Sequence, residues 1–81
     1  MIKVNELKAE MARNGFTTKK LAEELGIHPV TLSNKINGKT EFTCDEIMKI
    51  GEILHLSQER IAEIFLAINL RLSKKIIHYT Q

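Results

Sequence analysis

The 81-residue chain is 43% hydrophobic and 27% charged with a net charge of +2, which is the composition of one small folded domain rather than of a disordered tail. Its single cysteine, Cys44, excludes an internal disulfide, its three histidines are too widely spaced for a zinc motif, and no apolar run approaches the roughly 18 residues of a membrane span. We therefore expect a cytoplasmic protein that carries no metal or other cofactor and binds no membrane.

Caps and apolar spacing predict five helices, of which the first begins at the N-cap Asn5 and ends at Asn14-Gly15. The second begins at the N-cap Thr17 and is stopped by Gly26. Their buried faces are predicted from apolar residues at helical spacing: Val4, Leu7 and Met11 in the first helix, and Leu21, Ala22 and Leu25 in the second.

The third predicted helix has Pro29 at its first position, where the missing N–H is no loss, and it closes at Asn37-Gly38. The fourth begins with a capping box over residues 43–46, and the fifth begins after the N-cap Ser57. Their apolar faces consist of Leu32 and Ile36, then Ile47, Ile50, Gly51 and Leu54, then Ile61, Ile64 and Phe65.

Beyond Phe65 the pattern supports two structures. Ile68, Leu70 and Leu72 alternate with polar residues, as on a half-buried strand with which the N-terminal MIKV would pair. Ile68 and Leu72 also continue the helical stripe of the fifth helix. We favour the extended segment, and the helical alternative stays open.

The charge is unevenly distributed along the chain. Residues 41–66 carry a net −4, whereas residues 1–16, 17–40 and 67–81 carry +1, +2 and +3. A polyanion is therefore expected to approach the 17–40 segment, and the basic tail is a second, weaker candidate.

Residues 17–38 have the features that a helix-turn-helix requires. Ala22 is small where a second helix must cross closely, Gly26 suits the tight turn, and Leu21, Leu25, Ile27 and Leu32 can fix the crossing. Together with the sequence NGKT, this pattern resembles the lambda-repressor/Cro-type helix-turn-helix family, also called the XRE family. The resemblance covers residues 5–66 and is especially close to small repressors of temperate phages and prophages.

The resemblance implies an all-α, five-helix, lambda-repressor-like DNA-binding domain over residues 1–66, with a C-terminal extension over residues 67–81 that is a tail or serves dimerisation. It implies that Pro29–Ile36 is the recognition helix in the major groove of double-stranded DNA. The implied base contacts are His28, Pro29, Val30, Ser33 and Asn34, with Val30 on a thymine methyl and Asn34 on adenine. The implied phosphate contacts are Thr17, Thr18, Lys19, Lys35, Asn37, Lys39 and Thr40.

Two residues depart from the family pattern. Lys35 occupies a position, three before the closing Gly38, that is usually apolar, and Ile36 takes the apolar role. His28 occupies a position that usually holds a serine or threonine cap, and imidazole is a poorer cap.

We therefore expect a phage- or prophage-type repressor that binds an operator as a homodimer, because one recognition helix makes few base contacts. The expected dimer interface is Leu66, Ile68, Leu70 and Leu72. The alternative is a protein-interaction module, such as an antitoxin or antirepressor, that uses the same fold to bind a protein partner. No nucleophile lies near a base in the sequence, so we expect neither enzymatic activity nor a small-molecule substrate.

Overall fold

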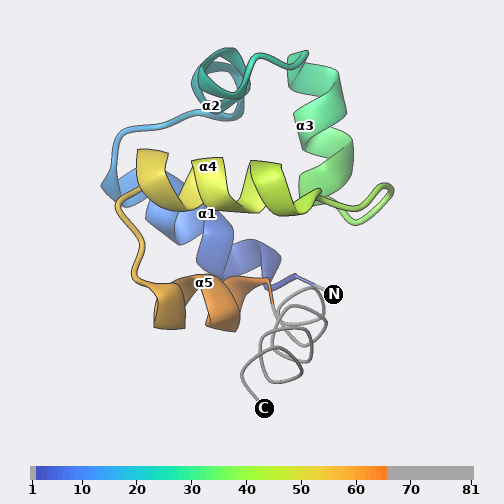
Figure 1. Ribbon diagram of the computed structural model, residues 1–81. Coiled ribbons are helices and arrows are strands. Elements are labelled where there is room, and N and C mark those ends of the chain that lie inside the picture. The colour runs from blue at the N-terminus through green and yellow to red at the C-terminus, as the bar shows by residue number, and fades with distance from the viewer. Residues whose placement is uncertain (1, 66–81) are drawn as a thin grey trace.

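The chain folds into helices joined by short connections in a computed structural model that describes residues 2–65 (Figure 1). The helices of the described part are α1 (Val4–Arg13), α2 (Thr18–Leu25), α3 (Pro29–Ile36), α4 (Cys44–Ile53) and α5 (Gln58–Ile64), and no strand occurs within it. The predicted all-α, five-helix class is confirmed. None of the described helices has the length and apolarity to cross a membrane.

Several predictions fall on residues outside the described part of the chain. They are the choice between strand and helix after Phe65, the extension 67–81, and the dimer interface at Leu66, Ile68, Leu70 and Leu72.

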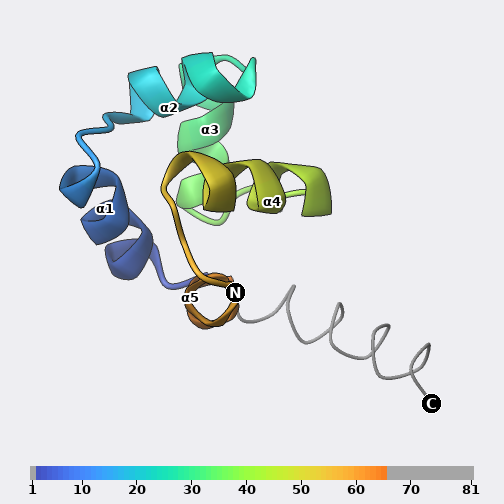
Figure 2. The ribbon, with the colours of Figure 1, turned by 60° about the vertical axis from the view of Figure 1, so that its left-hand side comes forward.

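The helices are stacked so that α2 and α3 lie at one end of the molecule and α5 lies at the other. Figures 1 and 2 show α4 crossing between these ends, and α2 packs against both α3 and α4. The helix α5 packs against α1 and α4.

Three of the predicted helix starts are confirmed by side-chain caps. Thr17 Oγ1 accepts a hydrogen bond from the Lys20 N–H at 3.1 Å, and Ser57 Oγ accepts one from the Arg60 N–H at 3.0 Å. Thr43 forms the predicted capping box with the carboxylate three residues later. Each cap satisfies an N–H group that the first helical turn leaves without an intrahelical partner.

The predicted N-cap of the first helix is wrong. The helix α1 begins at Val4 rather than after Asn5, and its N-cap residue is Lys3, whose side chain makes no capping bond. Instead, the Lys3 N–H donates to the Ile64 carbonyl oxygen at 2.8 Å. A contact with the end of α5, sixty-one residues away, therefore fixes where α1 starts.

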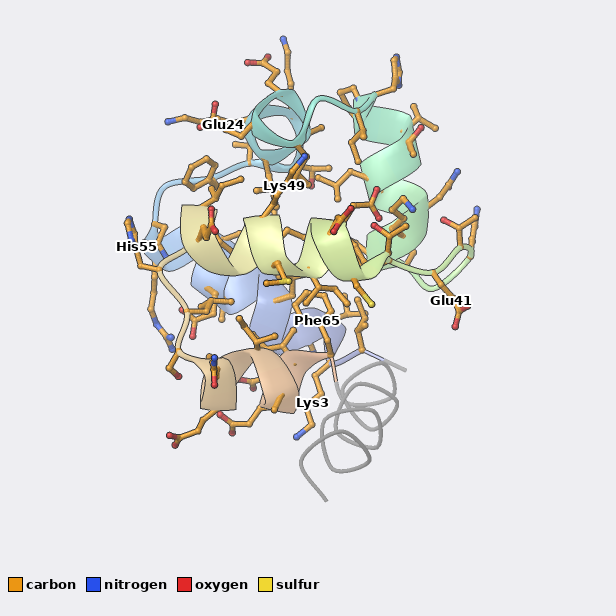
Figure 3. The ribbon with its side chains drawn as sticks, in the orientation of Figure 1. Lys3, Glu24, Glu41, Lys49, His55 and Phe65 are labelled. Carbon is orange, nitrogen blue, oxygen red and sulfur yellow. The ribbon has the colours of Figure 1, made fainter. Side chains whose placement is uncertain are left out.

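The core is aliphatic except for one aromatic pair. Phe42, in the loop after α3, and Phe65, at the end of α5, are buried with their ring centroids 5.3 Å apart in an edge-to-face arrangement at 83°. Figure 3 shows Phe65 between α4 and α5. The other buried apolar residues are Leu7, Met11, Leu21, Ala22, Leu25, Leu32, Ile36, Ile47, Ile50, Leu54 and Ile64.

A charged cluster ties α1 to α5 on the side of the molecule away from α3. Arg60 donates from Nε to Glu10 Oε2 at 2.6 Å and from Nη2 to Glu6 Oε1 at 2.7 Å, and Arg13 Nη1 lies 2.8 Å from Glu10 Oε2. The hydrogen bond from Arg60 outweighs the effect of burial and holds the pKa of Glu10 below its ordinary value. This cluster satisfies the one buried carboxylate of the described core.

Candidate nucleic-acid interface

The turn between α2 and α3 is formed by only three residues. Gly26 has φ = 72°, which is the left-handed region that glycine adopts at little cost, and the Ile27 N–H returns to the Ala22 carbonyl oxygen at 3.0 Å. Ala22 is fully buried, so the two helices approach closely at this point. The geometry is that of a helix-turn-helix in which α3 is the second, outer helix.

The inner face of α3 is anchored and its outer face is open. Leu32 and Ile36 are buried in the core, whereas Val30 is 60% exposed although it is apolar. Ser33 and Asn34 are half-buried and lie three and four residues after Val30, so the three share one face of the helix. This open face is where the sequence predicted base contacts.

Thr31 is also exposed on α3, although it was not among the base contacts predicted from the sequence. Its position next to Val30 in the first half of α3 was the signal available, because the N-terminal half of a recognition helix lies nearest the bases.

His28 caps the N-terminus of α3 through its ring. Its Nδ1 accepts a hydrogen bond from the Val30 N–H at 3.1 Å, and Pro29 occupies the first helical position as predicted. Because Nδ1 is the acceptor, the neutral ring carries its proton on Nε2. His28 is exposed, so this second nitrogen is a hydrogen-bond donor at the start of α3.

The first turn of α2 carries three of the predicted phosphate contacts. Thr17 and Lys19 are exposed and Thr18 is half-buried. Thr17 caps only the N–H of Lys20, so the preceding N–H groups of the first turn have no intrahelical partner. These groups and the positive end of the helix dipole favour an anion at this position.

The loop after α3 folds back onto the helix. Gly38 has φ = 83° and its N–H donates to the Lys35 carbonyl oxygen at 3.2 Å, while the Lys39 N–H donates to the Asn34 carbonyl oxygen at 2.9 Å. This pair of bonds is a Schellman motif. Lys39 and Thr40 are exposed next to it, so the loop that carries them is bonded to the same residue that is predicted to read a base.

Two of the other predicted phosphate contacts have polar partners within the protein. Asn37 is exposed, and its Nδ2 lies 3.4 Å from Ser33 Oγ. The Lys35 ammonium lies 3.1 Å from Glu46 Oε1 and donates to the Glu41 carbonyl oxygen at 2.9 Å. The phosphate role of Lys35 stays a prediction, and the Lys35–Glu46 ion pair was not predicted from the sequence.

A compact helical domain whose outer helix carries an open face, flanked by a helix N-terminus and by a loop that exposes Lys39, has the arrangement of a helix-turn-helix DNA-binding protein. The family model of the Cro/C1-type helix-turn-helix DNA-binding domain matches residues 6–65, so the chain belongs to this family. The resemblance seen in the sequence is thereby confirmed. Comparison with curated proteins and with solved structures finds no match.

Proposed function

We propose that this protein is a sequence-specific transcriptional regulator that binds an operator in double-stranded DNA as a homodimer, with Pro29–Ile36 in the major groove. The observation that carries the proposal is the open face of α3, where an apolar Val30 is 60% exposed beside Ser33 and Asn34. Single exposed apolar side chains are common on protein surfaces, so the position of Val30 is what matters. It lies on the outer helix of a helix-turn-helix, where a thymine methyl in the major groove is an apolar partner for it.

The proposed base contacts follow from the chemistry of each side chain. The Asn34 amide donates and accepts, which matches the N6 and N7 of adenine, and Ser33 can donate or accept. His28 offers Nε2–H as a donor to a guanine acceptor or a phosphate, since Nδ1 is engaged in the helix cap. A well-formed contact of this kind discriminates against the wrong base by about 1–3 kcal/mol.

The proposed phosphate contacts lie on both sides of the recognition helix. The first turn of α2, with Thr17, Thr18 and Lys19, offers backbone N–H groups to one strand. Asn37, Lys39 and Thr40 offer donors to the other side of the groove. These contacts supply affinity and orientation rather than specificity, and they make binding fall steeply with salt.

The homodimer follows from the small number of base contacts that one α3 helix can make. Two copies related by a two-fold axis would read half-sites roughly 34 Å apart, which is one turn of the duplex. The candidate contacts between copies are Leu66, Ile68, Leu70 and Leu72. Repression of a phage- or prophage-type promoter by exclusion of the polymerase is the simplest outcome of such binding.

Selection of bound duplexes from a random pool tests this function. For the wild-type protein we expect enrichment of an inverted repeat whose half-sites are one helical turn apart. For Asn34→Ala we expect the pool to lose its preference at one position in each half-site, with binding to the wild-type site weaker by about 1–3 kcal/mol.

Asn5→Ala is the matched control, since Asn5 is an exposed asparagine on α1 and its loss should leave both the selected site and the affinity unchanged. A pool without any enriched sequence at low salt would contradict the proposal and would favour the protein-interaction module. Enrichment of a single half-site without its inverted copy would contradict the homodimer and leave sequence-specific DNA binding in place.

A further inference from the structure

Lys35 lacks the exposed side chain that is expected of a lysine that contacts DNA. It lies in the last turn of α3, but only 12% of its side chain is exposed. Its ammonium group has two partners, Glu46 Oε1 at 3.1 Å and the Glu41 carbonyl oxygen at 2.9 Å. A long side chain loses rotamer freedom when it is held in this way, so its position depends on these partners.

The carboxylate partner of Lys35 belongs to the cap of the next helix. Glu46 Oε1 also accepts a hydrogen bond from the Thr43 N–H at 2.9 Å, and the Glu46 N–H donates to Thr43 Oγ1 at 3.1 Å. Only 18% of the Glu46 side chain is exposed, so solvent screens this ion pair less than it screens a pair on the open surface. One carboxylate therefore joins the end of α3 to the start of α4.

The bridge spans the loop of residues 37–43, which carries three of the proposed phosphate contacts, Asn37, Lys39 and Thr40. The Schellman bond from the Lys39 N–H to the Asn34 carbonyl fixes this loop to α3. The bonds of Lys35 to Glu46 and to the Glu41 carbonyl fix the same loop and the end of α3 to α4. The green and yellow parts of Figure 1 show the loop connecting the end of α3 to the start of α4.

We propose that Lys35 is a positioning residue for DNA binding, in place of the phosphate contact that the resemblance implies. Its bridge to Glu46 and Glu41 holds the recognition helix and the 37–43 loop in one orientation, so that Asn34 and Lys39 engage the duplex together. The proposal rests on the proposed DNA-binding function and deepens it.

The experiment measures the affinity for the selected duplex over a range of salt concentrations. The variants are Lys35→Met, Glu46→Gln and the double variant, with Lys39→Ala as the phosphate-contact standard. Glutamine keeps an oxygen that can accept from the Thr43 N–H, so Glu46→Gln removes the charge and retains the cap. Thermal unfolding of each variant verifies that it is folded at the assay temperature.

A positioning role predicts that Lys35→Met and Glu46→Gln each weaken binding by about three- to tenfold, and that the double variant is no weaker than the weaker single variant. The dependence of log K on log salt should remain that of the wild type, whereas Lys39→Ala should reduce its slope by about 0.9. Lys35→Arg keeps the cation and should restore binding to near the wild-type affinity.

A phosphate contact predicts the opposite pattern. Lys35→Met would then reduce the salt slope as Lys39→Ala does, and Glu46→Gln would tighten binding because it removes a competing anion. That result would overturn the positioning role while leaving the DNA-binding function in place. The same holds for an additive loss of affinity in the double variant and for unchanged affinity in both single variants. Failure of the wild-type protein to bind any duplex would overturn both.

Discussion

Val30→Glu is expected to abolish operator binding while leaving the fold intact. Val30 is 60% exposed, so its replacement should change the free energy of unfolding by no more than about 0.5 kcal/mol. In the major groove the new carboxylate would lie between two rows of phosphates without a partner, which costs several kcal/mol. The expected loss is about 3–5 kcal/mol of binding free energy, or more than a hundredfold in Kd.

Met48→Glu is the control for this prediction, because Met48 is 63% exposed on α4 and the substitution adds the same charge. We expect it to weaken binding only by its long-range repulsion, which salt screens. Fluorescence anisotropy with the selected duplex measures both affinities, and thermal unfolding checks both folds. Equal losses for the two variants would mean that net charge, rather than the face of α3, governs binding.

Phe65→Ala is expected to destabilise the domain by about 3–5 kcal/mol, the usual range for truncating a fully buried phenylalanine. The Phe65 ring is fully buried and meets the edge or face of Phe42 at 5.3 Å between centroids, so the substitution leaves a cavity and removes an aromatic contact. A small domain has about 5–15 kcal/mol of total stability, so the variant should be partly unfolded near physiological temperature. Urea unfolding followed by circular dichroism measures the loss.

Phe16→Ala is the matched comparison, since Phe16 is only partly buried, in the connection between α1 and α2. Its loss should cost clearly less than that of Phe65, because less apolar area leaves the core. If the two substitutions lowered the free energy of unfolding equally, the buried Phe42–Phe65 contact would contribute no more to stability than the partly buried Phe16 does.

The helices could be predicted because their boundaries depend on interactions within a few residues. The caps at Thr17, Thr43 and Ser57 bond three residues ahead, and Gly26 needs only its own left-handed conformation. Such signals are contained in a short stretch of sequence, and all of them are confirmed.

The missed features of the fold join residues that are far apart in the chain. The Lys3 N–H donates to the Ile64 carbonyl oxygen, and α1 begins at Val4 rather than after the predicted N-cap Asn5. Arg60 bonds to Glu10 across fifty residues, and no periodic pattern in either helix indicates this pair. Phe42 was missed as core because it lies in a loop, where apolar periodicity gives no information.

In the candidate site, too, features within one helix could be predicted, whereas contacts between helices could not. The family resemblance implied that Val30, Ser33 and Asn34 contact bases, and the three lie on one face of α3. The pairing of Lys35 with Glu46 was not predictable, because the partners belong to different helices and lysines are usually solvated. The contacts of these residues with DNA remain predictions.

Chemical-shift mapping with the selected duplex tests whether α3 is the helix that enters the major groove. We expect the amide signals of residues 30–36 to shift on titration, together with those at the N-terminus of α2 and at Lys39–Thr40. Signals in α1 and α5 away from this surface should stay in place. If no duplex at low ionic strength shifts the signals of α3, or if the shifts are confined to α1 and α5, then α3 is not a recognition helix.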